Sequence, residues 1–362
     1  MALWKKKKQK PYRERVAEFW DWFPTVAAEF ATQLENDQSD RVVPEVQKRM
    51  NSLMPGLSWV FGPGPGGVGE KGHSFTVTGE GQIARQLLAE FWLSQQLNVS
   101  GWTFYGSRQP SSEEFLQNMA IGFGDNDQVD ADTFLIRTEV DEEAEAIHIA
   151  AWHPAFDQLD EEHHGQILFI FLDEALGEFG TQTWIGNIEI EPVSEGKNTR
   201  PLAELPRFID SVAEYHKWEK LSPLESYTGY QADEDAELSE SPRGDTIVGT
   251  TCIPNVIFEF LENEGQLSED PLEGTGAEFV YIAVDGSVFP DGDQVDVRSN
   301  IEDTINEALA KESSGRSLGG AFGAGESYVE FLLFDSENGR RIIEDTLQDL
   351  QLGGRSRIES FA

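Results

Sequence analysis

The pattern that most constrains the fold lies in the C-terminal third of the chain. Apolar periodicity there predicts a strand, a helix, a hairpin of two strands, a second helix and a last strand. The predicted ranges are Glu278–Val284, Ile301–Lys311, Leu318–Phe334, Arg340–Leu350 and Ser356–Phe361. This order, β-α-β-β-α-β, is that of a ferredoxin-like split βαβ sandwich. We therefore expect an α+β protein of two modules, with residues 246–362 forming a ferredoxin-like domain.

The length of the chain favours more than one domain. A single hydrophobic core usually stops growing at about 250–300 residues, and this chain has 362. Residues 13–195 are expected to form an N-terminal α+β domain, and residues 196–245 a helix followed by a solvated acidic linker. Residues 1–12 are expected to be a basic, disordered tip. The acidic residues of the linker are Asp233, Glu234, Asp235, Glu237 and Glu240.

The N-terminal domain shows alternating helix and strand patterns. A long amphipathic helix is predicted from Tyr12 to Glu35, with a kink or a break near Phe23 because Pro24 follows it. Further helices of this domain are predicted at Pro44–Leu53, Ile83–Leu97 and, with a buried strand as the alternative, Ile167–Phe179. Beyond this domain, helices are predicted at Pro206–Trp218 and Val256–Glu262. The strands are predicted at Leu57–Phe61, Ser74–Thr78, Trp102–Tyr105, Thr133–Val140, Ala146–Trp152 and Trp184–Glu191.

The charge of the chain limits its partners. Its formal net charge is −39, and residues 16–362 alone hold 20 basic and 65 acidic residues, a net charge of −45. Such a body repels nucleic-acid phosphate and anionic lipid, so no nucleic acid and no membrane is expected to bind it. A basic protein partner is favoured instead. An alternative is that the acidity only keeps the protein soluble.

Targeting and cysteine usage indicate a cytoplasmic protein. Cys252 is the only cysteine, so no intrachain disulfide is expected, as in a reducing compartment. No apolar stretch of signal-peptide length follows the N-terminal lysines, and no run of 18 apolar residues occurs. These features predict a cytoplasmic location without a membrane span.

Two segments are similar to uncharacterised bacterial sequences. Phe19-Trp20-Asp21-Trp22-Phe23 resembles the start of a family of bacterial proteins of unknown function that begin with an F-W-x-W-F helix. The segment from Tyr328 to Asp335, together with Ile358-Glu359-Ser360-Phe361, resembles a C-terminal module of such proteins. Both are hydrophobic-core patterns, so the resemblance implies a fold and assigns no catalytic residue.

Short glycine-rich motifs lack the context that their chemistry requires. The loop Gly62–Gly72 contains G-x-G-x-x-G, but no helix pattern begins there to hold a phosphate. Gly315–Gly319 spells G-x-S-x-G, yet a nucleophile elbow needs a strand, a sharp turn and a helix. Ser194 and Lys197 match Ser-x-x-Lys in a polar stretch rather than on a helix. We interpret all three segments as loops, and none of them predicts a cofactor.

Four histidines form the main candidate for a metal site. They are His148, His153, His163 and His164, and carboxylates surround them in the sequence. Imidazole and carboxylate ligands suit zinc or iron. The spacing is unfavourable, because the first two histidines differ by an odd number on a strand and the last two are adjacent on a helix. The alternative is a polar loop with ordinary histidines.

Two acidic loops offer oxygen ligands for calcium. Asp125–Asp130 recurs almost unchanged as Asp291–Asp296. Neither copy has the glycine at position six of an EF-hand loop, and only the second has an acidic residue, Glu302, at position twelve. Both are interpreted as acidic turns.

The incomplete motifs and the charge together suggest a non-enzymatic role. We expect an interaction or regulatory protein, inhibitor-like or immunity-like, whose acidic surface receives a basic partner. The alternative is a metal-dependent hydrolase that uses the His148–His164 region. A third interpretation makes the acidity a nucleic-acid mimic.

Overall fold

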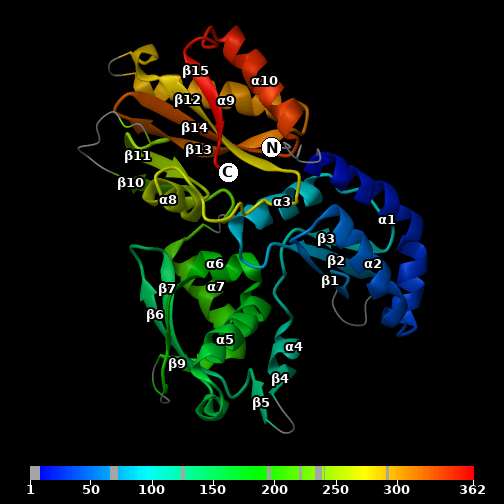
Figure 1. Cartoon of the computed structure of the whole chain (residues 1–362). Helices are drawn as coiled ribbons and strands as arrows, with labels where there is room; N and C mark the ends of the chain where they lie inside the picture. Colours follow the sequence, from blue (N-terminus) through cyan, green and yellow to red (C-terminus); the bar gives the residue numbers. More distant parts are fainter. Residues whose placement is uncertain are drawn as a thin grey trace, which may run out of the picture. The chain divides into compact units, whose positions relative to one another are not determined.

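The protein has a mixed α+β fold (Figure 1). The computed structural model describes residues 9–65, 72–123, 127–193, 196, 198–219, 222–232, 239, 241–290 and 293–362. The chain forms two compact units that interleave along the sequence. The first unit holds the chain through Leu57, Ile83–Val99 and Leu224–Ala362, and the second holds Ser58–Gln82 and Ser100–Pro223. The sequential domain boundaries expected at residues 195 and 245 stay a prediction.

The first unit begins with helices α1 (Tyr12–Glu35) and α2 (Ser39–Leu53), and it includes α3 (Ile83–Ser94). Helix α1 has the predicted bounds and runs through Pro24, so of the two expected alternatives, a kink or a break, the break does not occur. Proline removes only one backbone donor from the helix. The buried stripe of α1 continues on both sides of Pro24 and keeps the helix packed against its unit. This stripe consists of Tyr12, Val16, Phe19, Trp20, Phe23, Ala27 and Phe30.

Helix α1 is anchored within its unit by aromatic and polar contacts. The rings of Trp20 and Trp92 stack with centroids 5.0 Å apart, and Trp20 Nε1 donates to the Trp92 carbonyl at 3.0 Å. At the start of α1, Arg13 donates to the Glu312 carbonyl at 2.7 Å and to Asp335 Oδ2 at 2.8 Å. These bonds connect residues that lie about 300 positions apart in the sequence.

The rest of the first unit is built on a six-stranded sheet with the order β10-β11-β13-β14-β12-β15. Its strands are β10 (Thr228–Gln231), β11 (Thr246–Thr251), β12 (Glu278–Asp285), β13 (Gly315–Gly323), β14 (Glu326–Leu333) and β15 (Ser356–Ser360). Its helices are α8 (Pro254–Glu262), α9 (Gln294–Lys311) and α10 (Ser336–Asp349), with a 3-10 turn, η3, at Gly286–Val288. All neighbouring strands are antiparallel. The predicted order of strands and helices from Glu278 onward is therefore observed.

The two faces of this sheet are covered by different helices. Alternate residues of β12, Val280, Ile282 and Val284, belong to one core with residues of α9 and α10, which lie beside each other in Figure 1. Tyr281 points to the opposite face, since side chains alternate along a strand. There it contacts Phe260 of α8, with ring centroids 6.0 Å apart. Helix α8 therefore covers the face that α9 and α10 leave open.

The second unit contains a three-stranded sheet, β1-β2-β3. Its strands are β1 (Ser58–Pro63), β2 (His73–Thr78) and β3 (Trp102–Tyr105). The predicted hairpin of β1 and β2 is present, and β3 has the predicted bounds. Strands β2 and β3 pair in parallel.

The same unit contains a four-stranded sheet, β8-β7-β6-β9, and a two-stranded ribbon, β4-β5. The strands are β4 (Ala120–Phe123), β5 (Asp127–Asp130), β6 (Leu135–Asp141), β7 (Ala146–Trp152), β8 (Ile185–Ile190) and β9 (Thr199–Pro201). The helices are α4 (Glu113–Asn118), α5 (Glu161–Leu176), α6 (Glu178–Trp184) and α7 (Leu205–His216), and 3-10 turns lie at Pro154–Gln158 (η1) and Leu202–Glu204 (η2). Ile136, Ile149, Phe171 and Ile209 belong to the shared core of this sheet and its helices.

Two of the segments that differ from their predicted form are α5 and β10. Helix α5 begins at Glu161, six residues before the predicted start, because Asp160, Glu161 and Glu162 suit a helix N-terminus. Residues 228–231 form β10 inside the stretch expected to be an acidic linker. Tyr230 is buried there and pairs with β11, which explains the strand. Residues 233–238 and 240 lie outside the described residues. Within the described ranges, no helix is both long and apolar enough to span a membrane.

Candidate ligand pocket and predicted histidine site

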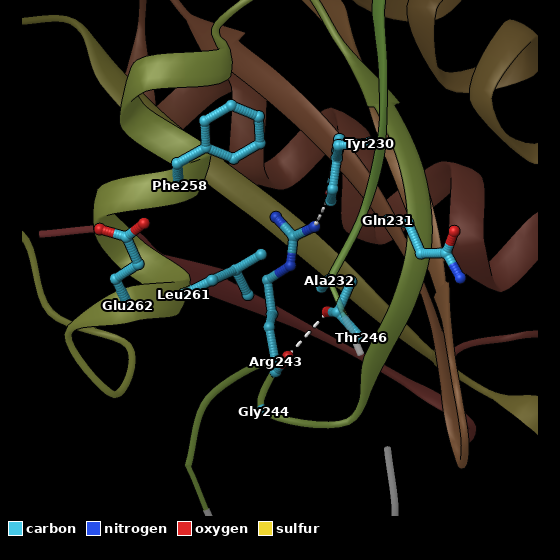
Figure 2. A pocket seen from close by; sticks show the side chains of 9 residues that line it. All are labelled: Tyr230, Gln231, Ala232, Arg243, Gly244, Thr246, Phe258, Leu261 and Glu262. Carbon is cyan, nitrogen blue, oxygen red and sulfur yellow. Dashed lines mark hydrogen bonds between the residues drawn. The ribbon is translucent and has the colours of Figure 1, made fainter. Parts of the chain in front are cut away.

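A pocket of about 340 Å³ lies between the edge strand β10 and helix α8 (Figure 2). Helix α8 supplies Phe258 and Leu261 to one wall, and the chain at and after β10 supplies Tyr230 and Ala232 to the other. Arg243, just before β11, rises between these walls in Figure 2. The size is that of sites for small organic molecules, which are usually apolar with a few placed polar groups.

The guanidinium of Arg243 is completely buried. Its Nη2 donates to the Tyr230 hydroxyl at 3.1 Å and lies 2.8 Å from Glu330 Oε1. The guanidinium carbon lies over the ring of Tyr328 at 4.9 Å, with the rings of Tyr281 and Phe361 slightly farther away. Such cation–π contacts stabilise a desolvated cation.

Two donors of this guanidinium are unsatisfied. Nε and Nη1 of Arg243 are buried and have no hydrogen-bond partner in the part of the chain that the structure describes. In Figure 2 the bonded nitrogen of Arg243 faces Tyr230, and the other terminal nitrogen points toward the α8 side of the pocket. Oε1 of Glu330 is likewise buried without a hydrogen-bond partner among the described residues, so the pair keeps both unsatisfied donors and an unsatisfied acceptor, which is costly in a buried site.

Glu330 is the buried counterion of Arg243. It lies on β14, and its Oε2 accepts a hydrogen bond from Thr251 Oγ1 at 2.9 Å. Burial raises the pKa of Glu330 above its ordinary value, although Arg243 and Thr251 act against this shift. For Arg243, burial acts to lower the pKa, but the charge of Glu330 and the neighbouring Tyr230 outweigh it and keep the guanidinium protonated.

A second buried carboxylate lies close by in the sequence. Asp245 accepts a hydrogen bond from the Tyr328 hydroxyl and two from the backbone amides of Gly325 and Glu326, at 2.8 and 3.2 Å. Burial, and then the hydrogen bond to Asp245 and its charge, raise the pKa of Tyr328. Burial and the charge of Glu330 raise the pKa of Tyr230 to about 12. Both phenols therefore stay protonated at physiological pH.

These polar residues were not predicted from the sequence. One signal was present, because Glu330 interrupts the apolar strand Tyr328-Val329-Glu330-Phe331-Leu332, and a charge in a buried strand needs a partner. No pattern indicated that Arg243, which follows the acidic segment, would be this partner. Their pairing depends on two strands that lie far apart in sequence.

The histidines on and after β7 have separate partners. His148 accepts a hydrogen bond at Nδ1 from the Asn187 amide at 2.9 Å, and its Nε2 lies 3.4 Å from Asp141. His153 accepts at Nδ1 from the Ala155 amide at 3.0 Å, which caps η1. Its Nε2 lies 3.5 Å from Asp130 Oδ2. Burial lowers the pKa of His153, although Asp130 acts against this shift.

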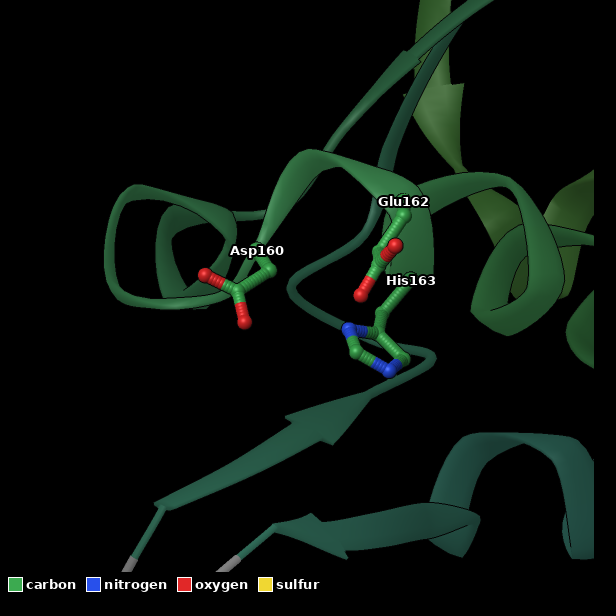
Figure 3. A group of neighbouring side chains, drawn as sticks. All are labelled: Asp160, Glu162 and His163. Carbon is green, nitrogen blue, oxygen red and sulfur yellow. The ribbon is translucent and has the colours of Figure 1, made fainter.

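The two histidines of α5 also diverge. His164 is buried, stacks on Phe156 with centroids 4.3 Å apart, and its Nε2 lies 3.1 Å from the carbonyl oxygens of Phe156 and Leu159. His163 is exposed, and Figure 3 shows it beside Glu162, with Asp160 nearby. One potential ligand atom from each of these three side chains lies within 4.8 Å of the others.

The structure therefore does not gather the four predicted histidines into one ligand set. Three of them have local partners, and the fourth belongs to an exposed group in which the other members are carboxylates. Whether this group binds a metal stays a prediction.

The remaining motifs fall on strands or outside the described residues. Ser317 of G-x-S-x-G lies within β13 rather than at a turn into a helix. Residues 66–71 of the glycine-rich loop, 125–126 and 291–292 of the acidic loops, and 194, 195 and 197 of the Ser-x-x-Lys segment lie outside the described residues.

Comparison with protein-family models, with curated proteins and with solved structures found no match for this chain.

Proposed function

We propose that the chain is a non-enzymatic interaction or regulatory protein, inhibitor-like or immunity-like, whose acidic surface receives a basic partner. The observation that carries the proposal is an acidic helical face formed by the exposed residues of α9 and α10. Its seven acidic residues are Asp296, Asp303, Glu307, Glu337, Glu344, Asp345 and Asp349. The exposed basic residues of these helices are Lys311 and Arg341.

The arrangement of this face favours binding over mere solubility. Because α9 and α10 lie side by side on one face of the sheet, their exposed charges share one surface (Figure 1). Arg341 is engaged by Asp345 at 3.1 Å, so it compensates only one of the carboxylates. Charges of one sign on one surface steer an oppositely charged protein and raise its association rate.

Charge reversal on the helical face tests the proposal. The triple variant Asp303→Lys, Glu307→Lys, Asp349→Lys should lose a basic protein that the unaltered chain retains in low-salt pull-downs. The control variant Glu139→Lys, Glu142→Lys, Glu143→Lys makes the same charge change on exposed positions of the second unit and should retain it. Equal loss with both variants, or retention of no basic protein, would contradict the proposal, as would turnover by the purified protein.

We also propose that β12-α9-β13-β14-α10-β15 is a ferredoxin-like module of a cytoplasmic protein. The strand order β15-β12-β14-β13 supports this assignment, since the first and third strands of the module pair at its centre. The single cysteine, Cys252, is a free buried thiol, which supports a reducing compartment.

The rival proposal is a metal-dependent hydrolase centred on the His148–His164 region. The exposed group of Asp160, Glu162 and His163 supports it, because these are acceptable ligands for zinc or manganese. Elemental analysis of untagged protein decides between the two proposals. Stoichiometric zinc, manganese or iron would favour the hydrolase, and a metal-free preparation would exclude it.

A further inference from the structure

Strand β15 is an edge strand of the six-stranded sheet, with β12 as its neighbour (Figure 1). Two backbone bonds show which side of β15 faces β12. The Phe361 amide donates to the Phe279 carbonyl at 3.2 Å, and the Asp285 amide donates to the Arg355 carbonyl at 2.9 Å. Because hydrogen-bonded positions alternate along an antiparallel pair, the odd-numbered residues of β15 face β12. The backbone groups of its even-numbered residues therefore face away from the sheet.

These outward groups belong to Ser356, Ile358 and Ser360. Their amides have no hydrogen-bond partner in the part of the chain that the structure describes. The carbonyl oxygen of Ile358 is contacted by Arg340 Nη1 of α10 at 3.5 Å, a long bond that leaves its second lone pair available. The strand has no proline, no lysine and no bulge, which are common protections of an edge. This edge is therefore able to pair with a further strand.

The side chains of β15 are complementary to a second copy of the same strand. Its sequence is Ser-Arg-Ile-Glu-Ser. When two copies pair antiparallel about a two-fold axis at Ile358, Arg357 of each lies opposite Glu359 of the other. Opposite charges at directly opposed positions stabilise a strand pair, and like charges destabilise it. The pattern therefore favours a second copy in this register.

Arg357 and Glu359 are accessible for this contact, with 50% and 47% of their side chains exposed. Arg357 also donates from Nη2 to Glu326 of β14 at 2.7 Å. A guanidinium has five N–H donors, so this ion pair leaves donors for a second carboxylate.

We propose that β15 is a dimer interface, at which two copies of this chain join their six-stranded sheets by antiparallel β15–β15 pairing. The backbone groups of Ser356, Ile358 and Ser360 form the inter-chain ladder, and the opposed Arg357 and Glu359 set its register. This interface needs no basic partner, so it does not depend on the function proposed above.

The net charge of the chain gives the dimer a distinctive dependence on salt. Two copies with a formal net charge of −39 repel each other, and this repulsion is screened beyond about 8 Å at physiological ionic strength. The dimer should therefore become tighter as salt rises from low to physiological concentration. Binding of a basic protein by the acidic helical face should weaken over the same range. The two proposals can therefore fail separately.

Analytical ultracentrifugation of the full chain over a concentration series tests the interface. At physiological salt, the apparent mass should rise from one chain to two as the concentration increases. Glu359→Arg places two arginines opposite each other, and Arg357→Glu places two glutamates opposite each other. Each variant alone should dimerise about tenfold more weakly or less. Glu139→Arg makes the charge change of the first variant at an exposed position of the second unit and should dimerise as the unaltered chain does.

Mixing the two variants separates the interface from any effect on folding. Glu359→Arg carries two positive charges on β15 and Arg357→Glu carries two negative ones, so an equimolar mixture should form a heterodimer. Circular dichroism checks that both variants are folded. An unaltered chain that stays monomeric at every concentration, single variants that dimerise as it does, or a mixture that stays monomeric would each overturn the proposal.

Discussion

Arg243 and Glu330 show how the first unit tolerates two charges in its interior. Both side chains are completely buried, 2.8 Å apart at their closest atoms, and aromatic rings surround the guanidinium. Taking two ions out of water costs several kcal/mol each, so such a pair is fragile to the loss of either partner. The effect of the Arg243–Glu330 pair on stability can be measured separately from the place of Arg243 in the pocket.

Replacing Arg243 alone should destabilise the protein strongly. Arg243→Met leaves Glu330 buried without its counterion, and we expect the free energy of unfolding to fall by about 3–5 kcal/mol. The double variant Arg243→Met, Glu330→Leu removes both charges and should recover most of this loss. Denaturant unfolding followed by circular dichroism measures both values. A double variant as unstable as Arg243→Met would show that packing, rather than the unpaired charge, causes the loss.

His153 should make stability depend on pH. Its pKa is lowered by burial, so the unfolded chain binds a proton more readily than the native protein does. Stability should then be lost as the pH falls from about 7 through the ordinary histidine value of about 6.5. His153→Asn keeps an acceptor for the Ala155 amide but cannot titrate.

The pH dependence of chemical denaturation between neutral and mildly acidic conditions checks this expectation. The unaltered protein should lose more free energy of unfolding over this range than His153→Asn does. Parallel profiles for the two proteins would contradict the assignment.

Cys252 should be unreactive in the native protein. It is 1% exposed, and burial raises the pKa of its thiol to about 11, so little thiolate forms at neutral pH. Iodoacetamide should label it slowly in buffer and rapidly in denaturant, as followed by mass spectrometry. Rapid labelling of folded protein would show that the segment between β11 and α8 opens.

Among the elements, β13 depends on a single glycine. Its pairing with β14 shifts register between Ser317 and Gly319, and Gly319 has a φ of +126°. A Cβ at this position would lie 2.1 Å from the Thr250 carbonyl oxygen of the neighbouring strand. Only glycine allows the bulge and the close approach of β11 at the same point.

Gly319→Ala should therefore lower the free energy of unfolding by about 2 kcal/mol or more, through backbone strain and steric overlap. Gly229→Ala in β10 is the matched control, because nothing lies within 4 Å of its added Cβ. Thermal unfolding of the two variants measures the difference. Equal unfolding midpoints for the two variants would show that β13 adjusts to the added methyl group without losing stability.

Long periodic elements could be predicted from the sequence, and most short ones could not. The bounds of α1 and β7 match the predictions because each has a clear apolar period and polar neighbours. The four-residue β3 was also predicted, because the aromatic residues Trp102 and Phe104 alternate along it. Strands β4, β5, β9 and β10 were missed, since each has three or four residues without such aromatic alternation.

The residues of the candidate pocket could not be predicted from the sequence for a similar reason. The histidines attracted attention because they lie close together in sequence, yet three of them have local backbone or ring partners. Arg243 and Glu330 lie in separate segments and meet only because β11, β13 and β14 are neighbours in the sheet. Sequence proximity and spatial proximity therefore pointed to different residues.

At the scale of the whole molecule, the net charge should make stability depend on salt. With a formal net charge of −39, the folded chain repels itself, and added ions screen that repulsion. The thermal unfolding midpoint should rise as sodium chloride increases from low to physiological concentration. The variant Asp303→Lys, Glu307→Lys, Asp349→Lys should show a smaller rise, since it carries six fewer net negative charges. A midpoint that falls with salt would indicate that ion pairs outweigh the repulsion.

The bonds from Arg13 to Glu312 and Asp335 have a consequence for the timing of folding. Helix α1 is synthesised early, but these partners emerge from the ribosome about 300 residues later. At about 5–20 residues per second, this delay is roughly 15 to 60 s. During that interval Trp20 can already pack on Trp92 of α3, but Tyr12 and Arg13 at the start of α1 still lack their partners near residues 312–335. The first unit can complete its fold only after β14 and α10 have been synthesised.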